Sequence, residues 1–523
     1  MYADDTDRPH HRGLLLLSIT LMVLVYFLDN LSIALANRYV YGGLGIDQRS
    51  YTLATACYSA AVIVTSAPHQ WFAQRLGYRN LIFAAVGIHL VGQVCCLVAT
   101  DLPTFIVGRA LMGAGAATFF AGARVLVQMY FSGPQLPTGI RAFASGVPLG
   151  GALASFTTAE LLEGHQWRAI FMVPALACAL VAVCVWLSLP RRSHPLENSG
   201  APSLLSMVLL TVGSLLLTTT TQRLAFDFFS DGPWLALELL VGAAILGLYV
   251  YYERGLARPT LDFKHAITPG FLAGMLFMML NYFLLGAYNF IIPQYVVNGL
   301  QLPVYTAGGV MALGWLCGLA PLLMITSVRL RERFPWGGFR KYLVAGYLLL
   351  AGYGFWMVRQ HADVPLYQQL VPGLMMHGTY LIGTFAVIIM YTFMRVEPAY
   401  FSQAYQIKNM TQQLVMPMGI VLSNVFLQWR DAFHASVLSA AVNPYAQTYQ
   451  AYGERYRQAT GADSALAQIS SLVTRQSQVL GYLDYFWLVG WSAGSVWHWP
   501  STWPCNGIFA RARRLPVLKP TFS

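Results

Sequence analysis

Runs of roughly 17–25 consecutive apolar residues recur along the whole chain, and this feature restricts the fold most. A run of this length spans about 30 Å of hydrocarbon as an α-helix. Of the 523 residues, 56% are hydrophobic and only 10% are charged, whereas a soluble domain carries about 25% charged residues. The apolar residues do not alternate over ten-residue segments, which excludes a transmembrane barrel. We therefore predict an all-α integral membrane protein.

Fourteen spans are predicted from these runs. They lie at 13–36, 51–67, 81–99, 105–130, 142–158, 170–189, 204–220, 234–252, 271–292, 306–325, 342–358, 370–393, 404–427 and 480–499. The polar start, MYADDTDRPHHRG, has no small-residue cleavage site after it. We therefore expect a cytoplasmic tail over 1–12 and a first helix that stays in the mature protein.

The net charge of +11 would suit either a nucleic-acid partner or a membrane, so the position of the charges has to decide. With the N-terminus inside, about 20 of the 32 basic residues lie in cytoplasmic segments and about 9 in external ones. This bias is typical of a multi-pass membrane protein. It predicts cytoplasmic termini at both ends and no nucleic-acid partner.

No cofactor is expected. The seven cysteines mostly sit inside apolar runs, without CxxC spacing or a nearby histidine pair, so we read them as packing residues and predict no metal site. The GxxxxGK[ST] loop that cradles nucleotide phosphates is absent from the sequence. A membrane-embedded enzyme or sensor should show clustered His, Asp or Glu, or an attached soluble domain. Neither is found, and this class stays a remote alternative.

Asp29 and Arg109 are the strongest functional candidates, because a charge in hydrocarbon costs at least about 2.5–3.5 kcal/mol. Asp29 lies about sixteen residues into the first span, and Arg109 lies about sixteen residues before the cytoplasmic end of the fourth. At about 1.5 Å per residue, both sit roughly 24 Å from the cytoplasmic side. An aspartate that alternates between an arginine and a proton would couple transport to protons. The alternative is a static ion pair that locks two helices.

Six further polar residues are candidates for a substrate pathway: Arg124, Lys408, Asn281, Tyr288, Asn289 and His377. Arg124 and Lys408 lie near span ends, so either can instead snorkel to the headgroups. Lys408 lies close to Gln406, Asn409, Gln412 and Gln413, and this polar cluster favours a lumen-facing position because it would otherwise face lipid. Together Arg124 and Lys408 would admit an anionic or weak-acid substrate. The asparagines and Tyr288 would bind aromatic solutes in a cavity or serve as interhelical contacts. A lone histidine such as His377 is more often a packing residue than a relay.

Three spans carry recognisable motifs. The first reads FLDNLSIALA, the fourth IVGRALMGAGAA and the fifth SGVPLGGALAS. These segments resemble the major facilitator superfamily, specifically its fourteen-span drug:proton antiporter branch of the EmrB/QacA type. The resemblance places Asp29 on the acidic position of that branch and Arg109 on the arginine of its Arg-x-x-x-Gly-x-Gly motif. It also identifies an antiporter motif, one residue short of the family's spacing, at Pro148, Gly150 and Gly151.

The connection after the second span reads QWFAQRLGYRN and resembles the cytoplasmic loop motif of the same family. Gln70 and Gln74 replace a glycine and an aspartate of that motif, and the aspartate normally helps to latch the two halves. In the thirteenth span, Gln412 replaces an arginine. The loop positions that match the family are Arg75, Gly77 and Arg79.

The resemblance implies a major facilitator fold with two six-helix bundles, at 13–190 and 269–500, and two extra linker helices within 191–268. The second bundle includes a long external connection, 428–479, which ends in an amphipathic helix that runs into the last span. That connection is either a cap without a partner or a docking surface for a periplasmic protein. A cytoplasmic tail is expected at 501–523.

By this resemblance, the chain is expected to export toxic amphipathic or aromatic compounds across the bacterial inner membrane in exchange for protons. It would be a secondary transporter and not an enzyme. A periplasmic adaptor and an outer-membrane channel are the expected partners, besides protons, the lipid bilayer and the substrate. The main alternative is a proton-coupled uptake symporter for an organic solute.

Overall fold

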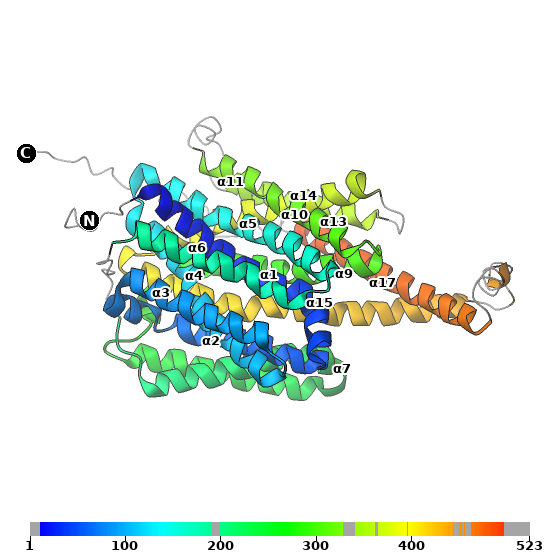
Figure 1. Cartoon of the computed structure of the whole chain (residues 1–523), viewed down its shortest axis with the longest axis horizontal. Coiled ribbons are helices and arrows are strands. Elements are labelled where there is room, and N and C mark those ends of the chain that lie inside the picture. Colours follow the sequence, from blue (N-terminus) through cyan, green and yellow to red (C-terminus); the bar gives the residue numbers. More distant parts are fainter. Residues whose placement is uncertain are drawn as a thin grey trace, which may run out of the picture.

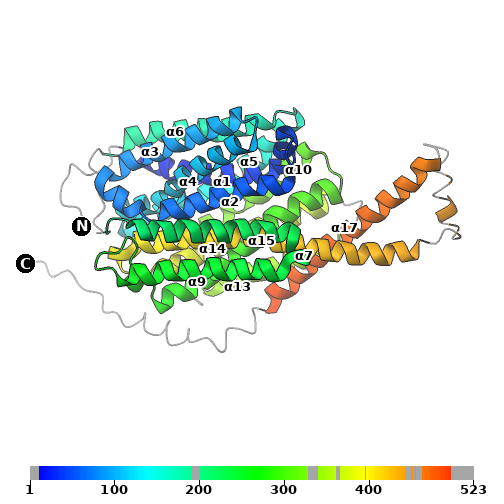
Figure 2. The ribbon, with the colours of Figure 1, turned by 90° about the horizontal axis from the view of Figure 1, so that it is seen from below.

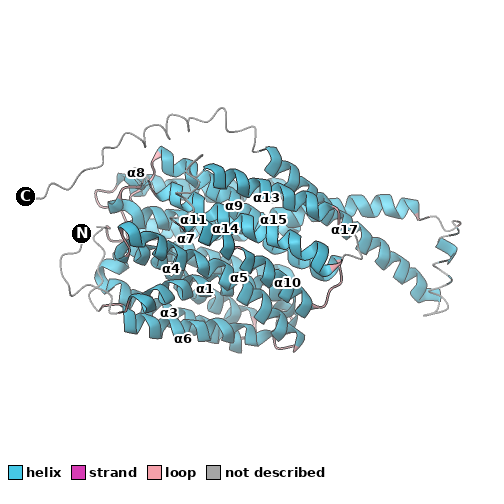
Figure 3. Cartoon of the chain, turned by 90° about the horizontal axis from the view of Figure 1, so that it is seen from above, coloured by secondary structure: helices cyan, strands magenta, loops and turns pink. Residues whose placement is uncertain are grey.

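The computed structural model describes residues 11–190, 199–327, 340–360, 365–394, 396–442, 445, 447, 449–451, 454 and 462–495. Within these ranges all regular elements are helices (Figure 3). The long helices run side by side along the longest axis of the molecule (Figure 1). The all-α prediction is therefore confirmed. The basic segments on which the orientation depends, including 191–192, 329–339 and 511–519, lie outside the described residues.

The N-terminal half consists of six long helices. These are α1 (Arg12–Leu44), α2 (Gln48–Ser66), α3 (His69–Val98), α4 (Leu102–Tyr130), α5 (Leu136–Glu163) and α6 (Met172–Ser188). Helix α1 packs along α5 and α6, and α4 packs against both α2 and α3. Lipid tails are as apolar as the side chains, so close packing and interhelical hydrogen bonds, more than hydrophobic burial, must hold these helices together.

The C-terminal half repeats this kind of packing. Its helices are α9 (Pro269–Gln294), α10 (Val304–Cys317), α11 (Leu319–Thr326), α13 (Arg340–Val358), α14 (Val371–Phe393), α15 (Phe401–Ala441) and α17 (Ala462–Ser495). Helix α9 packs on α15 and α14, while α13 packs on α14 and α17. The principal contact between the halves on one side joins α5 to α10.

Helix α7 (Leu204–Gly255) is the segment predicted as two linker spans. Its backbone leaves helical geometry at Asp231, where φ is −122° and ψ is 22°, and Pro233 follows. The two arms fold back on each other: the Ser206 hydroxyl donates a hydrogen bond to Glu253, and Thr220 donates one to Glu238 at 2.9 Å. Both arms are therefore helical and antiparallel, as a pair of spans requires.

The linker hairpin touches both halves, because α7 packs on α2 and on α15. Arg49 at the start of α2 forms an ion pair with Asp227 of α7. Two residues before Asp227, the Ala225 carbonyl oxygen accepts a hydrogen bond from Gln428 of α15 at 2.8 Å. The sequence predicts two extra helices but not that they bridge the seam between the halves.

Ten of the described helices are long and apolar enough to cross a membrane, so the count of fourteen spans is not confirmed. One of the ten is the whole of α7, which folds back at Asp231. Helices α2, α5 and α17 are not among the ten, because they lack an apolar stretch of sufficient length and hydropathy. Helix α2, for example, reads QRSYTLATACYSAAVIVTS and carries hydroxyl and polar side chains throughout.

The long external connection predicted at 428–479 differs in form from the expectation. Helix α15 does not end near 427 but continues to Ala441, and α17 begins at Ala462, so the connection between helices is much shorter. The extended parts of α15 and α17 project together beyond the ends of the other helices (Figure 2). A continuous helix through the predicted amphipathic segment and the predicted last span is confirmed, because α17 runs uninterrupted from Ala462 to Ser495.

Two aspartates fix helix starts at the same end of the N-terminal half. Asp47 caps α2 by accepting hydrogen bonds from the Ser50 hydroxyl and amide, and Asp101 caps α4 by accepting one from the Thr104 amide. An N-cap side chain satisfies an otherwise unpaired amide of the first turn. These hydrogen bonds, which favour the ionised form, hold the pKa of both carboxyl groups below the ordinary value.

Candidate functional site

Asp29 of α1 and Arg109 of α4 meet inside the N-terminal half, as their equal predicted depth allows. Arg109 Nη1 lies 3.4 Å from Asp29 Oδ1, and the two residues are only 1% and 2% exposed. The guanidinium also lies over the Tyr58 ring, with Cζ 4.2 Å from the ring centroid. Asp29 Oδ2 has no hydrogen-bond partner among the described residues. One carboxylate oxygen is thus free to take a proton while the other faces the arginine.

A cavity of about 150 Å³ borders this ion pair, and we call it the Arg109 cavity. Its wall includes Arg109, Tyr58 and Asn30 from the N-terminal half and Asn289 and Gln413 from the C-terminal half. Residues of α7 complete the wall. A space of this size accommodates a single aromatic ring. The cavity therefore lies between the two halves and next to the ion pair of Asp29 and Arg109.

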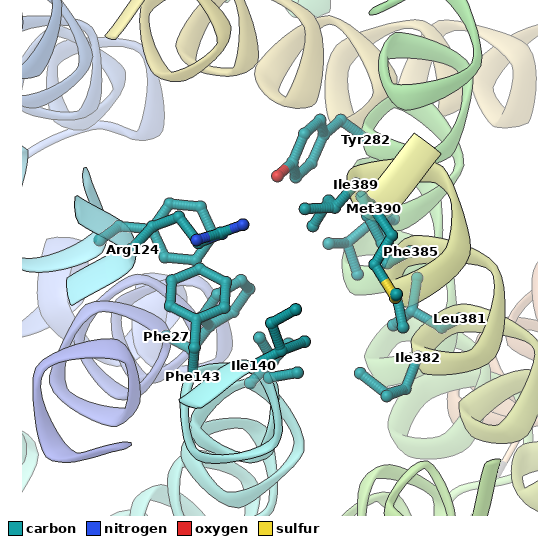
Figure 4. A pocket seen from close by; sticks show the side chains of 15 residues that line it. Phe27, Arg124, Ile140, Phe143, Tyr282, Leu381, Ile382, Phe385, Ile389 and Met390 are labelled. Atoms are coloured by element: carbon teal, nitrogen blue, oxygen red, sulfur yellow. The ribbon is translucent and has the colours of Figure 1, made fainter. Parts of the chain in front are cut away.

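A second, smaller cavity of about 40 Å³ lies between α1, α4 and α5 on one side and α9 and α14 on the other, and we call it the Arg124 cavity. Arg124 points into it from the N-terminal half, and Tyr282 and Ile389 face it from the C-terminal half (Figure 4). Phe27 and Phe143 add aromatic surface beside Arg124. At this volume the cavity holds a few water molecules but no substrate until the halves separate.

Lys408 of α15 is fully buried and does not snorkel. Its ammonium donates a hydrogen bond to Gln412 Oε1 at 2.8 Å, and no carboxylate of the described residues forms a salt bridge with it. Aromatic rings surround the charge: Nζ lies 4.1 Å from the Phe120 centroid, 4.8 Å from that of Tyr405 and 5.2 Å from that of Tyr282. Phe120 and Tyr282 also line the Arg124 cavity.

One polar stripe of α15 joins the two halves by neutral hydrogen bonds. Its members lie three to four residues apart, which puts them on one helix face. Ser402 bonds Gln70 at 2.7 Å, Gln406 bonds His69 at 3.0 Å, and Asn409 bonds Ser66 at 3.1 Å. Further along the same helix, Gln412 and Gln413 both donate to the Tyr26 hydroxyl.

This stripe gives Gln70 a partner where the family motif differs. Gln412 likewise bonds both Lys408 and Tyr26 at the position where relatives have an arginine. Sequence inspection singled out Gln406, Asn409, Gln412 and Gln413 as a polar cluster but missed Ser402 and the partners on α2 and α3. The missed signal is the helical spacing of polar residues from 402 to 413, which is typical of a buried face.

The loop motif is folded differently from the expectation of a loop. His69–Val98 is helical apart from a break at Gly77, whose φ of 75° and ψ of 154° are accessible to glycine but strained for other residues. Arg75 stacks on Trp71, with Cζ 4.2 Å from the ring centroid, and Arg79 donates to the Trp186 carbonyl oxygen at 3.2 Å. The motif thus turns the chain between α2 and the body of α3.

The antiporter motif lies inside α5 at the contact between the halves. Pro148 lies within the continuous helix, and a Cβ atom added to Gly151 would lie 2.4 Å from the Trp315 ring of α10. Gly150 faces α1 instead. Only a glycine at 151 permits this approach of α5 to the C-terminal half.

The remaining predicted residues do not all meet at one site. Asn281 exchanges hydrogen bonds with Tyr347, Tyr380 and Thr384 inside the C-terminal half. Tyr288 and His377 stack on each other, with ring centroids 3.6 Å apart and an interplanar angle of 2°. None of Asn281, Tyr288 and His377 lines either cavity, whereas Asn289 lines the Arg109 cavity.

A second contact between the halves was not predicted. Arg38 near the end of α1 donates to Gln294 Oε1 and to Asn298 Oδ1, each at 3.1 Å. The contact lies near the C-terminal end of α1. Among the described residues, no group of three or more His, Cys, Asp or Glu side chains is placed to hold a metal ion.

Comparison with known proteins agrees with this architecture. The family model described as "Major Facilitator Superfamily" matches residues 15–420. The chain is 23% identical over 425 residues to the "Putative multidrug resistance protein MdtD" of Salmonella typhi, covering 80% of this chain and 87% of that protein. The protein of the same name from Salmonella paratyphi A matches with the same identity and coverage.

Solved structures with the same fold include a bacterial homologue of the human lysosomal transporter Spinster, at a TM-score of 0.53 and 15% identity over 94% of this chain and 98% of that chain. A POT family transporter in complex with a thioalcohol-conjugated peptide gives a TM-score of 0.55 and 13% identity, covering 91% of this chain and 95% of that one. At such identities the likeness concerns the fold alone.

Proposed function

The chain belongs to the major facilitator superfamily, and from this premise we propose that it exports toxic amphipathic or aromatic compounds in exchange for protons. As a member of this family it is a secondary transporter of small solutes and not an enzyme. The observation that carries the proposal is the buried Asp29–Arg109 pair at the wall of a cavity between the halves.

In the proposed cycle, Asp29 alternates between Arg109 and a proton. When the carboxylate is ionised, the pair is neutral overall and its burial is tolerated. Protonation of the free Oδ2 weakens the attraction and releases Arg109, which borders the cavity through which the solute passes. Rocking of the two halves would then expose the cavity to the other side, as in transporters built from repeated bundles.

Export, and not uptake, is supported by two independent features. The motif at Pro148, Gly150 and Gly151 resembles the antiporter motif, and Gly151 lies at the contact with Trp315 of the other half. The similar Salmonella proteins bear the name "Putative multidrug resistance protein MdtD". The solved structures bear on the fold only and favour neither direction.

We further propose fourteen spans in the bacterial inner membrane with both termini in the cytoplasm. The ten apolar helices, the second arm of α7, and α2, α5 and α17 would make up this number. Two six-helix bundles at 13–190 and 269–500, joined by the linker helices, remain the proposed organisation. The positive-inside bias of the loops supports this orientation.

The projecting parts of α15 and α17 would contact a periplasmic adaptor, and through it an outer-membrane channel. Arg430 and His434 of α15 both bind Asp484 of α17, with distances of 2.6 Å, which holds the two helices together where they leave the bundle. Trp429, Phe433 and Val437 are spaced four residues apart and about half exposed there. Such an apolar face is typical of a protein contact.

The proposal is tested with purified protein in liposomes that carry an imposed proton gradient. Addition of a fluorescent aromatic dye should dissipate the gradient and move the dye in the direction opposite to the protons. Accumulation of the solute with the protons would identify an uptake symporter instead. Dye movement that ignores the gradient would reject proton coupling.

A further inference from the structure

Arg124 is a buried cation, and no acidic side chain of the described residues forms an ion pair with it. It is 5% exposed, and its Nη1 atom has no hydrogen-bond partner among the described residues. Its close neighbour is the Phe401 ring, with Cζ 4.8 Å from the centroid. A cation–π contact compensates only part of the lost hydration of a guanidinium. A buried donor left in this condition either costs stability or serves a ligand.

Apart from its contact with Phe401 of α15, the guanidinium faces a cavity. In Figure 4 it points from α4 into the Arg124 cavity, toward Tyr282 and Ile389 on the other side. The residues that line this cavity are apolar or aromatic apart from Arg124 itself and the Tyr282 hydroxyl, and they include no carboxylate. The site therefore offers hydrogen-bond donors and aromatic surface but no negative charge.

Lys408 adds a second positive charge just behind the wall. Its ammonium lies against Phe120 and Tyr282, two rings that also line the Arg124 cavity. No described acidic side chain lines this cavity, and the buried ones are paired elsewhere. Asp29 faces Arg109, Asp227 pairs with Arg49, and Glu253 accepts hydrogen bonds from Ser206 and the Thr260 amide. The field at the cavity is thus positive, and it is not compensated by the described groups.

We propose that the Arg124 cavity binds the anionic group of an aromatic substrate, so that the transported compounds are organic anions. Arg124 donates its fork of N–H groups to a carboxylate or sulfonate, which is the geometry that guanidinium suits. The rings of Phe27, Phe120 and Phe143 hold the aromatic body. Lys408 strengthens anion binding through its field without touching the ligand. This inference rests on the proposed export function and narrows its substrate class.

Equilibrium binding to the purified full chain in detergent tests the inference with three radiolabelled probes of similar shape. These are naphthalene-2-sulfonate, a permanent anion; 2-naphthylmethanol, which is neutral; and (2-naphthylmethyl)trimethylammonium, a permanent cation. The wild type should bind the anion about tenfold or more tightly than either of the others, because a hydrogen bond to a charged group is a strong one. Equal or tighter binding of the cation overturns the inference.

Variants assign the effect to the residues. Arg124→Gln should weaken anion binding about tenfold and change the neutral probe by less than about twofold, while Arg124→Lys should lie between, because lysine keeps the charge but not the fork. Lys408→Gln should weaken anion binding less than Arg124→Gln does. If Arg124→Gln weakens all three probes equally, the inference is wrong. If Arg124→Gln does not fold, Arg124→Lys replaces it as the test. Anion selectivity of Arg124→Lys equal to that of the wild type would then show that the inference is wrong.

Binding requires no gradient, so the two proposals fail separately. Anion-selective binding without proton-driven movement would reject the export function and leave the Arg124 site in place. Proton-driven export of the neutral and cationic probes in preference to the anion would support the export function and reject the Arg124 site as an anion site.

Discussion

Ser402 of α15 donates a hydrogen bond to Gln70 of α3 at 2.7 Å, although 332 positions separate the two residues in the sequence. Gln70 also accepts a hydrogen bond from the Tyr78 hydroxyl. In the motif that this segment resembles, a glycine and an aspartate stand where this chain has Gln70 and Gln74, and here neutral side chains link the halves. A neutral contact of this kind is weakly sensitive to salt, since no ionic charge is screened.

Gln70→Leu should loosen this contact between the halves. Loss of one neutral hydrogen bond costs about 1 kcal/mol, so the separated arrangement should become about fivefold more populated. A cysteine introduced at Ala144, which lines the Arg124 cavity, should react correspondingly faster with a maleimide in a background without the native cysteines. Gln93→Leu is the matched control, because it makes the same change on α3 at a buried side chain without a hydrogen-bond partner. Equal labelling in both variants would contradict the role of Gln70.

Asp29→Asn should abolish proton-driven transport and lower stability. The change leaves Arg109 buried without its counter-charge, and breaking a buried pair in this way costs about 3–5 kcal/mol. The double variant Asp29→Asn/Arg109→Gln should recover much of the thermal stability of the detergent-solubilised protein, but not proton-driven flux. Full drug resistance of cells that carry Asp29→Asn would reject the coupling role and leave the pair as a static lock.

Gly151→Ala should impair transport by forcing α5 away from α10. The new Cβ atom would lie 2.4 Å from the Trp315 ring, and overpacking of this kind costs about 1–3 kcal/mol. In a Trp315→Leu background the same change should cost less, so the two effects on Tm should not add. Gly87→Ala on α3 serves as the control, because its Cβ atom would meet nothing within 4 Å. Additive effects would place the cost of Gly151→Ala somewhere other than the contact with Trp315.

Asp484→Asn should separate transport from delivery to an adaptor. Arg430 and His434 lose the carboxylate that joins α15 to α17, but these groups are partly exposed, so the free energy of unfolding should fall by no more than about 1 kcal/mol. Transport in liposomes should be unchanged, whereas export from whole cells should decrease if the projecting helices bind an adaptor. Asp231→Asn, at the exposed turn of α7, is the control. A parallel loss in liposomes would argue that Asp484 acts within the transport cycle itself.

The contact between Asp29 and Arg109 is an example of what sequence reasoning reached. The rise per residue of a helix is fixed, so two residues at known positions in neighbouring spans can be assigned the same depth. Depth alone does not show which side chains face each other, and this limit appears at Asn281, Tyr288 and Asn289. All three lie on α9, yet only Asn289 reaches the Arg109 cavity. Rotation of the helix about its axis, set by its neighbours, decides which residue does so.

Helix ends and long-range partners were harder to predict. The apolar run ends near 427, but α15 continues to Ala441 because α17 packs along it beyond the bundle. The polar residues of α15 were identified as a cluster, yet their partners Ser66, His69 and Gln70 lie more than 300 positions away. Nothing in the local sequence of either segment specifies the other.

The sequence by itself determined that the chain lies in a membrane, that it is helical, and at what depth its buried charges lie. The reason is that apolar run length and helix rise are local properties. The tertiary structure alone decided which polar faces meet. It placed α7 across the seam of the two halves, gave Gln70 a neutral partner, and left Arg124 facing a cavity without an acid. These features arise from packing between distant segments, whose geometry depends on every helix that surrounds them.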